Sequence, residues 1–245
     1  MRRFVVVLLS ATVMSIVAAN AADLPMKAPV YAPPVPLQYN WTGCYLGGQL
    51  GGGWARTQFN NTASTAAFGD LIPGEGFRQT DGGFIGGGQL GCNYQTGAWV
   101  FGLEGTFAGS TFKGNVSNTS FGARDDIFTT KIESIATVTG LIGYAADNWL
   151  FYAKGGYGGG EVKFSVSDTV GPATGAGSGS NWQNGWTVGG GVEYGLTPNW
   201  ILGLEYDFVD LQTKNYNVAG SAAGIYAFDV HPQIQEILAR ISYKF

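Results

Sequence analysis

The sequence predicts an all-β fold, an eight-stranded antiparallel up-and-down β-barrel that crosses a membrane. Three observations lead to this fold class. Eight segments alternate apolar and polar residues, as strands with two different faces do. Their connections alternate between tight turns and long loops, which is typical of transmembrane barrels. Aromatic residues recur at the tight turns, and closure of eight such strands would leave no unpaired edge in lipid.

A fifty-residue repeat of aromatic residues marks the tight turns. Each unit ends an alternating segment on a tyrosine and continues, after a short polar turn, with a tryptophan. Such rings prefer a lipid–water interface because one edge is apolar and the other can hydrogen-bond. We therefore expect an aromatic girdle at one membrane boundary. Its six members are Tyr94, Trp99, Tyr144, Trp149, Tyr194 and Trp200.

The first 40 residues are expected to lie outside the barrel. Residues 1–21 combine a positive start at Arg2 and Arg3, a short apolar stretch and a small-residue cleavage site, and are interpreted as a secretory signal peptide. That stretch, about fifteen residues long, is short for a spanning helix, which needs about twenty. Residues 22–40 hold five of the nine prolines, which cannot pair in a sheet. We interpret them as a periplasmic tether, and residues 41–245 as the barrel.

The expected strands are the eight alternating segments. Between them, the connections expected on the outer side are long and rich in glycine, serine, threonine and asparagine, as at 60–70 and 171–180, and are predicted to be solvated and mobile. The eight segments are 42–54, 83–95, 98–110, 131–145, 149–164, 184–195, 199–209 and 234–245.

The turn aromatics also assign the two faces of each segment. If each turn tyrosine or tryptophan points outward, that face is apolar and the opposite face is polar. A soluble β-sandwich, the alternative fold, would show the reverse, so lipid is the expected neighbour of the apolar face. Leu150, Tyr152 and Ile201 break the pattern because they point inward under the same rule.

Every charge in the central parts of the segments falls on the inner face. Three of these charged residues lie five positions after a turn tryptophan, and a fourth lies five before Phe245. With a strand rise of about 3.3 Å and a tilt near 40°, they lie roughly 13 Å above the girdle, near mid-membrane. Paired buried charges are tolerated where isolated ones are not. We predict that Glu104, Lys154, Glu205 and Arg240 form a structural ion-pair layer that closes the lumen.

Composition limits the partners of the chain. Residues 1–21 contain two of the 13 Lys and Arg residues and none of the 17 Asp and Glu residues, so the remaining chain is acidic. This balance argues against a nucleic-acid partner. Cys44 and Cys92 both fall on the lipid face. We expect two free thiols there, with a disulfide as the alternative if the stagger of the strands places them side by side.

Residues that could carry catalysis or bind a cofactor are few. Residues 86–91 match G-x-G-x-x-G, but that motif binds phosphate only between a strand and a helix, and here it lies inside an expected strand. His231 is the single histidine and is expected in an outer loop. With Asp210 on the same connection, it would still need a nucleophile. The sequence therefore predicts no enzyme activity, no cofactor and no metal site.

Several segments together resemble a known family. They are YNWTGCYLGGQLGGGW at 39–54, GLIGYA at 140–145, GGVEYGL and NWILGLEYDF in the sixth and seventh segments, and ILARISYKF at the end. The pattern is similar to the porin-like outer-membrane proteins of alphaproteobacteria, which are surface antigens with an OmpA-like eight-stranded barrel. The resemblance implies an integral protein of the bacterial outer membrane. Four residues depart from the family's usual ones, namely Cys44, Cys92, Thr137 and Thr139.

The sequence favours a structural, surface-exposed envelope protein whose neighbour is outer-membrane lipid. Ile241, Tyr243 and Phe245 resemble the signal that barrel-assembly machinery recognises, so we expect this machinery as a partner. A small porin is one alternative, although eight strands leave an interior just wide enough for side chains. A receptor or adhesin is the other, binding an unknown extracellular ligand through residues 55–82, where Phe59, Phe68 and Phe77 stand among polar residues.

Overall fold

The computed structural model describes residues 39–64, 76–117, 127–167, 176–219 and 225–245. These residues belong to a compact unit that spans Gln38–Phe245. The signal peptide expected over 1–21 and all but the last two residues of the expected tether lie outside the described residues. The same holds for Phe68.

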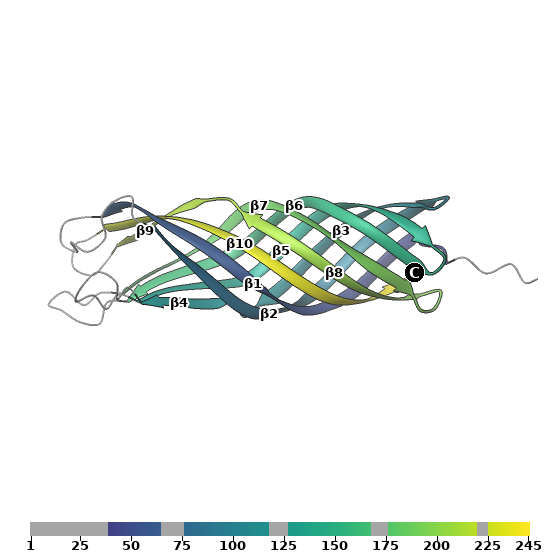
Figure 1. Cartoon of the computed structure of the whole chain (residues 1–245), viewed down its shortest axis with the longest axis horizontal. Coiled ribbons are helices and arrows are strands. Elements are labelled where there is room, and N and C mark those ends of the chain that lie inside the picture. The colour runs from purple at the N-terminus through teal and green to yellow at the C-terminus, as the bar shows by residue number, and fades with distance from the viewer. Residues whose placement is uncertain (1–38, 65–75, 118–126, 168–175, 220–224) are drawn as a thin grey trace, which may run out of the picture. The chain divides into compact units, whose positions relative to one another are not determined.

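The described residues form ten strands in one closed antiparallel sheet (Figure 1). They are β1 (Gly43–Ser64), β2 (Gly76–Thr96), β3 (Trp99–Ser110), β4 (Lys113–Ser117), β5 (Ile127–Ala146), β6 (Trp149–Ser167), β7 (Ala176–Gly195), β8 (Trp200–Leu211), β9 (Lys214–Ala219) and β10 (Ile225–Lys244). β3 and β4 together form one wall of the barrel, which is interrupted at residues 111–112. β8 and β9 form another, which is interrupted at residues 212–213. Pairing of β1 with β10 closes the barrel, which confirms the predicted eight-stranded fold class.

The strands run further at the loop end than the sequence predicts. β1 continues to Ser64 and β7 already begins at Ala176. The prediction of mobile loops over 60–70 and 171–180 is therefore wrong for residues 60–64 and 176–180. His231 likewise lies inside β10 and not in a loop. Beyond the lipid the outward face of a strand meets water while the inward face stays buried, as at Phe59 and Phe164, so the outward apolar pattern ends while the backbone pairing continues. The predicted boundaries followed the alternation.

The tight turns bring the aromatic residues to one end of the barrel, where β10 also ends (Figure 1). Gly97 has φ of 60° and Asp147 has φ of 52°, the left-handed conformation that two-residue hairpin turns require and that Gly and Asp tolerate. In the third turn, the Leu196 N–H donates to the Trp200 carbonyl at 2.9 Å. We call this the turn end of the barrel and the opposite one the outer end.

A band of exposed apolar side chains covers the outside of the barrel. Phe84 is 73% exposed, Leu103 69% and Leu50 68%. Large apolar side chains gathered in this way are costly in water, whereas an apolar outer band is the lipid-facing surface of a transmembrane barrel. Within the described ranges, no helix is long and apolar enough to cross a bilayer.

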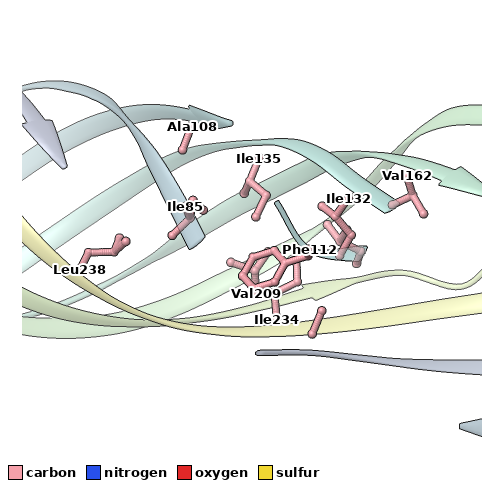
Figure 2. Packing of buried hydrophobic residues seen from close by; sticks show 11 residues of the cluster. Ile85, Ala108, Phe112, Ile132, Ile135, Val162, Val209, Ile234 and Leu238 are labelled. Atoms are coloured by element: carbon pink, nitrogen blue, oxygen red, sulfur yellow. The ribbon is translucent and has the colours of Figure 1, made fainter. Parts of the chain in front are cut away.

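Side chains fill the inside of the barrel in layers. In Figure 2, Phe112 reaches inward from the interruption between β3 and β4 and lies beside Val209 and Ile234. This cluster, the outer plug, comprises Ala55, Ile85, Ala108, Phe112, Ile132, Ile135, Val162, Val209, Leu211, Ile234 and Leu238. A second cluster, the turn-end plug, comprises Tyr39, Trp41, Val100, Leu141, Leu150, Tyr152 and Ile201. The inward placement of Leu150, Tyr152 and Ile201 agrees with the face assignment from the sequence.

Candidate functional site

A group of buried charged side chains fills the lumen between the two plugs. Lys154 of β6 places its Nζ 2.7 Å from Glu205 Oε1 of β8 and 3.3 Å from Glu104 Oε1 of β3. Arg240 of β10 bonds Glu205 through Nη1 and Glu104 through Nη2. All four side chains are buried. The structure thus brings together the four residues that the sequence places at one depth.

Two tyrosines complete the hydrogen bonds of these carboxylates. Tyr45 OH donates to Glu104 Oε2 at 2.7 Å, and Tyr152 OH donates to Glu205 Oε2 at 2.5 Å. The Tyr152 hydroxyl also accepts a hydrogen bond from Arg240 Nη1 at 2.9 Å. Neither tyrosine is among the four residues that the sequence predicts for the layer. Their inward parity was the available signal, but parity alone does not show which polar atoms a ring can reach.

Two further acids enlarge the group. Asp207 Oδ2 lies 3.0 Å from Lys154 Nζ, and Glu193 Oε1 lies 3.9 Å from Arg240 Nη2. Two bases therefore share four carboxyl groups. We call the whole set the lumen cluster: Tyr45, Glu104, Tyr152, Lys154, Glu193, Glu205, Asp207 and Arg240.

Burial makes the pairing in the lumen cluster obligatory. A charge that is removed from water without a partner costs several kcal/mol or more, whereas a charge that is paired and hydrogen-bonded is tolerated. Arg240 meets this condition because its planar fork contacts two carboxylates at once. The cluster therefore works as a polar crosslink that joins β1, β3, β6, β7, β8 and β10 across the lumen.

Glycines in the barrel wall make room for the two cluster tyrosines. A Cβ at Gly191 would lie 2.7 Å from the Tyr152 hydroxyl and 2.6 Å from the Leu204 carbonyl oxygen. A Cβ at Gly91 would lie 2.6 Å from the Tyr45 hydroxyl. All three distances are too short for real contacts. These wall positions must stay small for the tyrosines to reach their carboxylates.

Gly191→Ala is expected to destabilise the barrel by about 1–3 kcal/mol, the usual range for overpacking. The added methyl group would displace Tyr152 and press on the backbone of β8. The measurement is the midpoint of urea unfolding in lipid vesicles. Gly140→Ala is the matched control, because nothing lies within 4 Å of a Cβ at that exposed position. Equal stability of the two variants would contradict the close fit around Tyr152.

The six expected girdle residues lie at the turn end of the barrel. There, rings of neighbouring hairpins pack in pairs, since each turn tryptophan stands opposite the tyrosine that ends a later strand. Ring centroids are 5.8 Å apart for Trp99 and Tyr144, and 4.7 Å for Trp149 and Tyr194. Trp200 pairs instead with Tyr243 of β10 at 5.3 Å. The repeat in the sequence thus reflects cross-strand contacts in one ring.

The three residues expected to form the assembly signal all face outward at the seam of the barrel. Ile241 and Tyr243 are exposed on β10, and Phe245 is exposed just after its end. The Phe245 N–H donates to the Cys44 carbonyl at 3.0 Å. These three side chains are therefore directed toward lipid and are accessible from outside the barrel.

Cys44 and Cys92 form a disulfide, so the expected pair of free thiols is wrong. The two residues stand directly opposite each other on β1 and β2. The sequence left this alternative open because the offset between two strands cannot be read from parity. Such bonds persist in the oxidising space outside the inner membrane. The bond joins the first two walls of the barrel next to the β1–β10 seam.

The loop surface expected to bind a ligand is largely part of the barrel. Phe59 lies in β1 with its side chain buried, and its ring centroid is 5.8 Å from that of Phe164. In the β1–β2 register Phe59 stands opposite Phe77. Phe59 is therefore a core residue and not an exposed anchor, which corrects the expectation for residues 55–82 at this position.

His231 lies on the outward-facing surface of the barrel and contacts a single acid. Its Nε2 is 2.9 Å from Asp210 Oδ1, and Asp210 Oδ2 accepts a hydrogen bond from Gln233 at 2.9 Å. In the part of the chain that the structure describes, no hydroxyl or thiol is hydrogen-bonded to His231. The pair connects β8 with β10. Residues 86–91, which match the glycine motif, lie within β2 with no helix after them.

The closed barrel, its apolar band and its aromatic turns are the features of an outer-membrane protein, and comparison with protein families agrees. The family model described as outer membrane protein beta-barrel domain matches residues 9–245. The chain belongs to this family. It is therefore a protein of the bacterial outer membrane, in contact with membrane lipid, as the sequence predicts.

Curated relatives come from two genera. The 31 kDa outer-membrane immunogenic protein of Brucella melitensis is 33% identical over 220 residues, covering 86% of this chain and 88% of the relative. The 25 kDa outer-membrane immunogenic protein of Brucella canis is 28% identical over 249 residues, covering 96% and 99%. The 22 kDa outer membrane protein of Rhizobium leguminosarum is 30% identical over 189 residues, covering 76% and 71%. These relatives confirm the resemblance to alphaproteobacterial outer-membrane proteins.

Among solved structures, the outer membrane protease OmpT from Escherichia coli covers 85% of this chain and 99% of its own, with a TM-score of 0.51 and 11% identity. At this level of identity the likeness shows a shared barrel fold and nothing about activity.

Proposed function

We propose that the protein is a structural, surface-exposed component of the outer membrane, with a lumen closed to ions and without enzyme activity. The lumen cluster carries the proposal, because its bonded charges lie between two apolar plugs. An ion would have to displace Arg240 or Lys154 from their carboxylates and then pass buried side chains such as Phe112 and Leu150. An eight-stranded barrel has an interior just wide enough for side chains to fill.

Surface exposure is supported by the relatives, two of which are named outer-membrane immunogenic proteins. A receptor or adhesin role loses its best sequence argument, since Phe59 is buried. Absence of catalysis is supported by the outer-wall position of the His231–Asp210 pair, where the described contacts supply no nucleophile.

The closed lumen predicts negligible steady conductance. Purified monomer would be incorporated into planar lipid bilayers and recorded at the single-channel level, after its heat-modifiable migration in electrophoresis has shown that it is folded. We expect only rare, brief openings. Large and stable currents from this folded monomer would contradict the closed lumen and favour the small-porin alternative.

We also propose that the barrel-assembly machinery recognises the outward face of Ile241, Tyr243 and Phe245. Deletion of Phe245 is expected to lower the membrane-inserted, heat-modifiable fraction sharply, while export continues. The measurement is the ratio of inserted to periplasmic protein in fractionated cells. Leu196→Ala removes another exposed apolar residue at the same end of the barrel and serves as the control. Normal insertion of the Phe245 deletion would show that the ring is an ordinary girdle residue.

A further inference from the structure

Three lysines form a row on the outward-facing surface of the barrel, near its outer end. Lys113 of β4 stands directly opposite Lys131 of β5, and Lys131 stands directly opposite Lys163 of β6. All three side chains are exposed. Like charges directly opposite each other on neighbouring strands destabilise a sheet. A row of three such residues is therefore unfavourable by itself and favourable when an anion lies across it.

Hydroxyl groups extend the lysine row into a groove. Ser180 stands opposite Lys163 on β7, and the next row outward has Thr129 opposite Ser165 and Ser165 opposite Ser178. The three lysines and these four hydroxyl residues line a groove of about 400 Å³. We call it the lysine groove. It offers ammonium groups beside hydroxyl groups that can donate or accept, the combination that suits a phosphate attached to a polyhydroxylated headgroup.

Acidic neighbours hold the groove in a defined charge state. Glu133 accepts from Lys131 Nζ at 2.9 Å and from Lys163 Nζ at 2.7 Å. These hydrogen bonds lower the pKa of the Glu133 carboxyl, and the bond from Lys163 has the larger effect. The hydrogen bond to Glu133 in turn raises the pKa of Lys163. Glu161, on β6, accepts from Ser180 Oγ at 2.7 Å. Lys113 has no acidic partner among the described residues, which leaves one ammonium free and two that Glu133 can release.

The lysine groove lies at the depth of lipid headgroups. On β7, Ser180 is two residues beyond Trp182, which is exposed and donates through Nε1 to the Tyr157 hydroxyl at 3.0 Å. Tryptophan and tyrosine collect at the lipid–water interface, and Trp182 and Tyr157 lie at the outer limit of the apolar band. The lysine row therefore begins roughly 5 Å beyond that interface, given a rise of about 3.3 Å per residue and a tilt near 40°.

We propose that the lysine groove binds the phosphate groups of a phosphorylated glycolipid in the outer leaflet of the membrane. Lys113, Lys131 and Lys163 contact the phosphate oxygens, and the serine and threonine hydroxyls contact the sugar hydroxyls. The headgroup takes the place of Glu133 on two of the lysines. The proposal depends on the outer-membrane location of the chain and is independent of whether the lumen conducts.

The test measures binding of purified lipid A, a bisphosphorylated glycolipid, to the folded protein in dodecyl maltoside by native mass spectrometry. Each lysine near an anionic surface contributes about fivefold, so Lys113→Gln, Lys131→Gln and Lys163→Gln together are expected to weaken binding by roughly 100-fold. Glu133→Gln is expected to tighten it by about fivefold, because it frees two lysines. Arg56→Gln with Arg78→Gln, two exposed bases on β1 and β2, is the control and leaves binding unchanged.

The heat stability of the variants without lipid A shows whether the three lysines serve to bind a ligand or to stabilise the barrel. Without lipid A, the triple variant is expected to have nearly the heat stability of the wild type, because it loses two exposed ion pairs with Glu133 and also loses the repulsion in the row, and both effects are small. If it does not fold, Lys113→Gln alone replaces it, since this residue has no ion pair among the described residues, and a loss of about fivefold is expected. Equal binding by the wild type and the lysine variants would overturn the proposal.

Competition identifies the source of the phosphate. Dephosphorylated lipid is expected not to bind, and inorganic phosphate is expected to displace lipid A only at a large excess. Displacement by inorganic phosphate at matched concentration would overturn the lipid assignment in favour of a free-anion site. Dextran sulfate that binds where lipid A does not would overturn it in favour of a sulfated polysaccharide.

Discussion

Arg240→Ala is expected to destabilise the barrel by about 3–5 kcal/mol, the range for removing one partner of a buried ion pair. Arg240 contacts Glu104 and Glu205 and lies 3.9 Å from Glu193. In the variant only Lys154 remains to neutralise these carboxylates and Asp207. The measurement is urea unfolding of the protein in lipid vesicles, supported by the temperature at which the folded electrophoretic band is lost.

Two further variants show whether the loss belongs to the cluster. Lys163→Ala removes a base from an exposed ion pair with Glu133, and such pairs contribute about 0–1 kcal/mol. Arg240→Lys keeps the charge but loses the planar fork, so we expect an intermediate loss. A loss for Arg240→Ala that is no larger than that for Lys163→Ala would contradict the crosslinking role of the lumen cluster.

The inward charges could be predicted from the sequence because two rules act on the same positions. A charge that faces lipid near mid-membrane costs about 2–4 kcal/mol, so parity assigns Glu104, Lys154 and Glu205 to the lumen without any structure. Equal offsets from the turn tryptophans then give a common depth. The girdle follows from the same repeat, because the turns set the register of each hairpin.

What the sequence could not provide is the offset between neighbouring walls and the reach of long side chains. The disulfide depends on Cys44 standing opposite Cys92, a register that one residue of slip would abolish. Tyr45 and Tyr152 reach the carboxylates only because Gly91 and Gly191 leave space. The outer ends of the strands also escaped prediction, since Phe59 and His231 lie beyond the outward apolar pattern that marks the strands within lipid.

The turn end of the lumen shows a further contact that parity does not reveal. Residues just before β1 fold across the barrel opening, where the backbone N–H of Trp41 donates to Gln95 Oε1 at 2.8 Å and the backbone N–H of Gln95 donates to Thr42 Oγ1 at 3.0 Å. Tyr39 packs on Trp41 with ring centroids 4.6 Å apart. Trp41 is 0% exposed. Its ring thus belongs to the turn-end plug, together with Leu150 and other inward side chains.

Trp41→Ala is therefore expected to cost about 3–5 kcal/mol of unfolding free energy, because a buried ring is lost and a cavity remains below the lumen cluster. The same urea unfolding in vesicles measures it. Trp54→Ala is the control on the same chain segment: its ring is exposed on the lipid face of β1, where lipid chains refill the space and no cavity is added. Conductance of Trp41→Ala should stay negligible, since the lumen cluster and the outer plug are intact. A stability loss equal to that of Trp54→Ala would show that the ring does not hold the plug together, and stable currents would show that Trp41 alone seals the lumen.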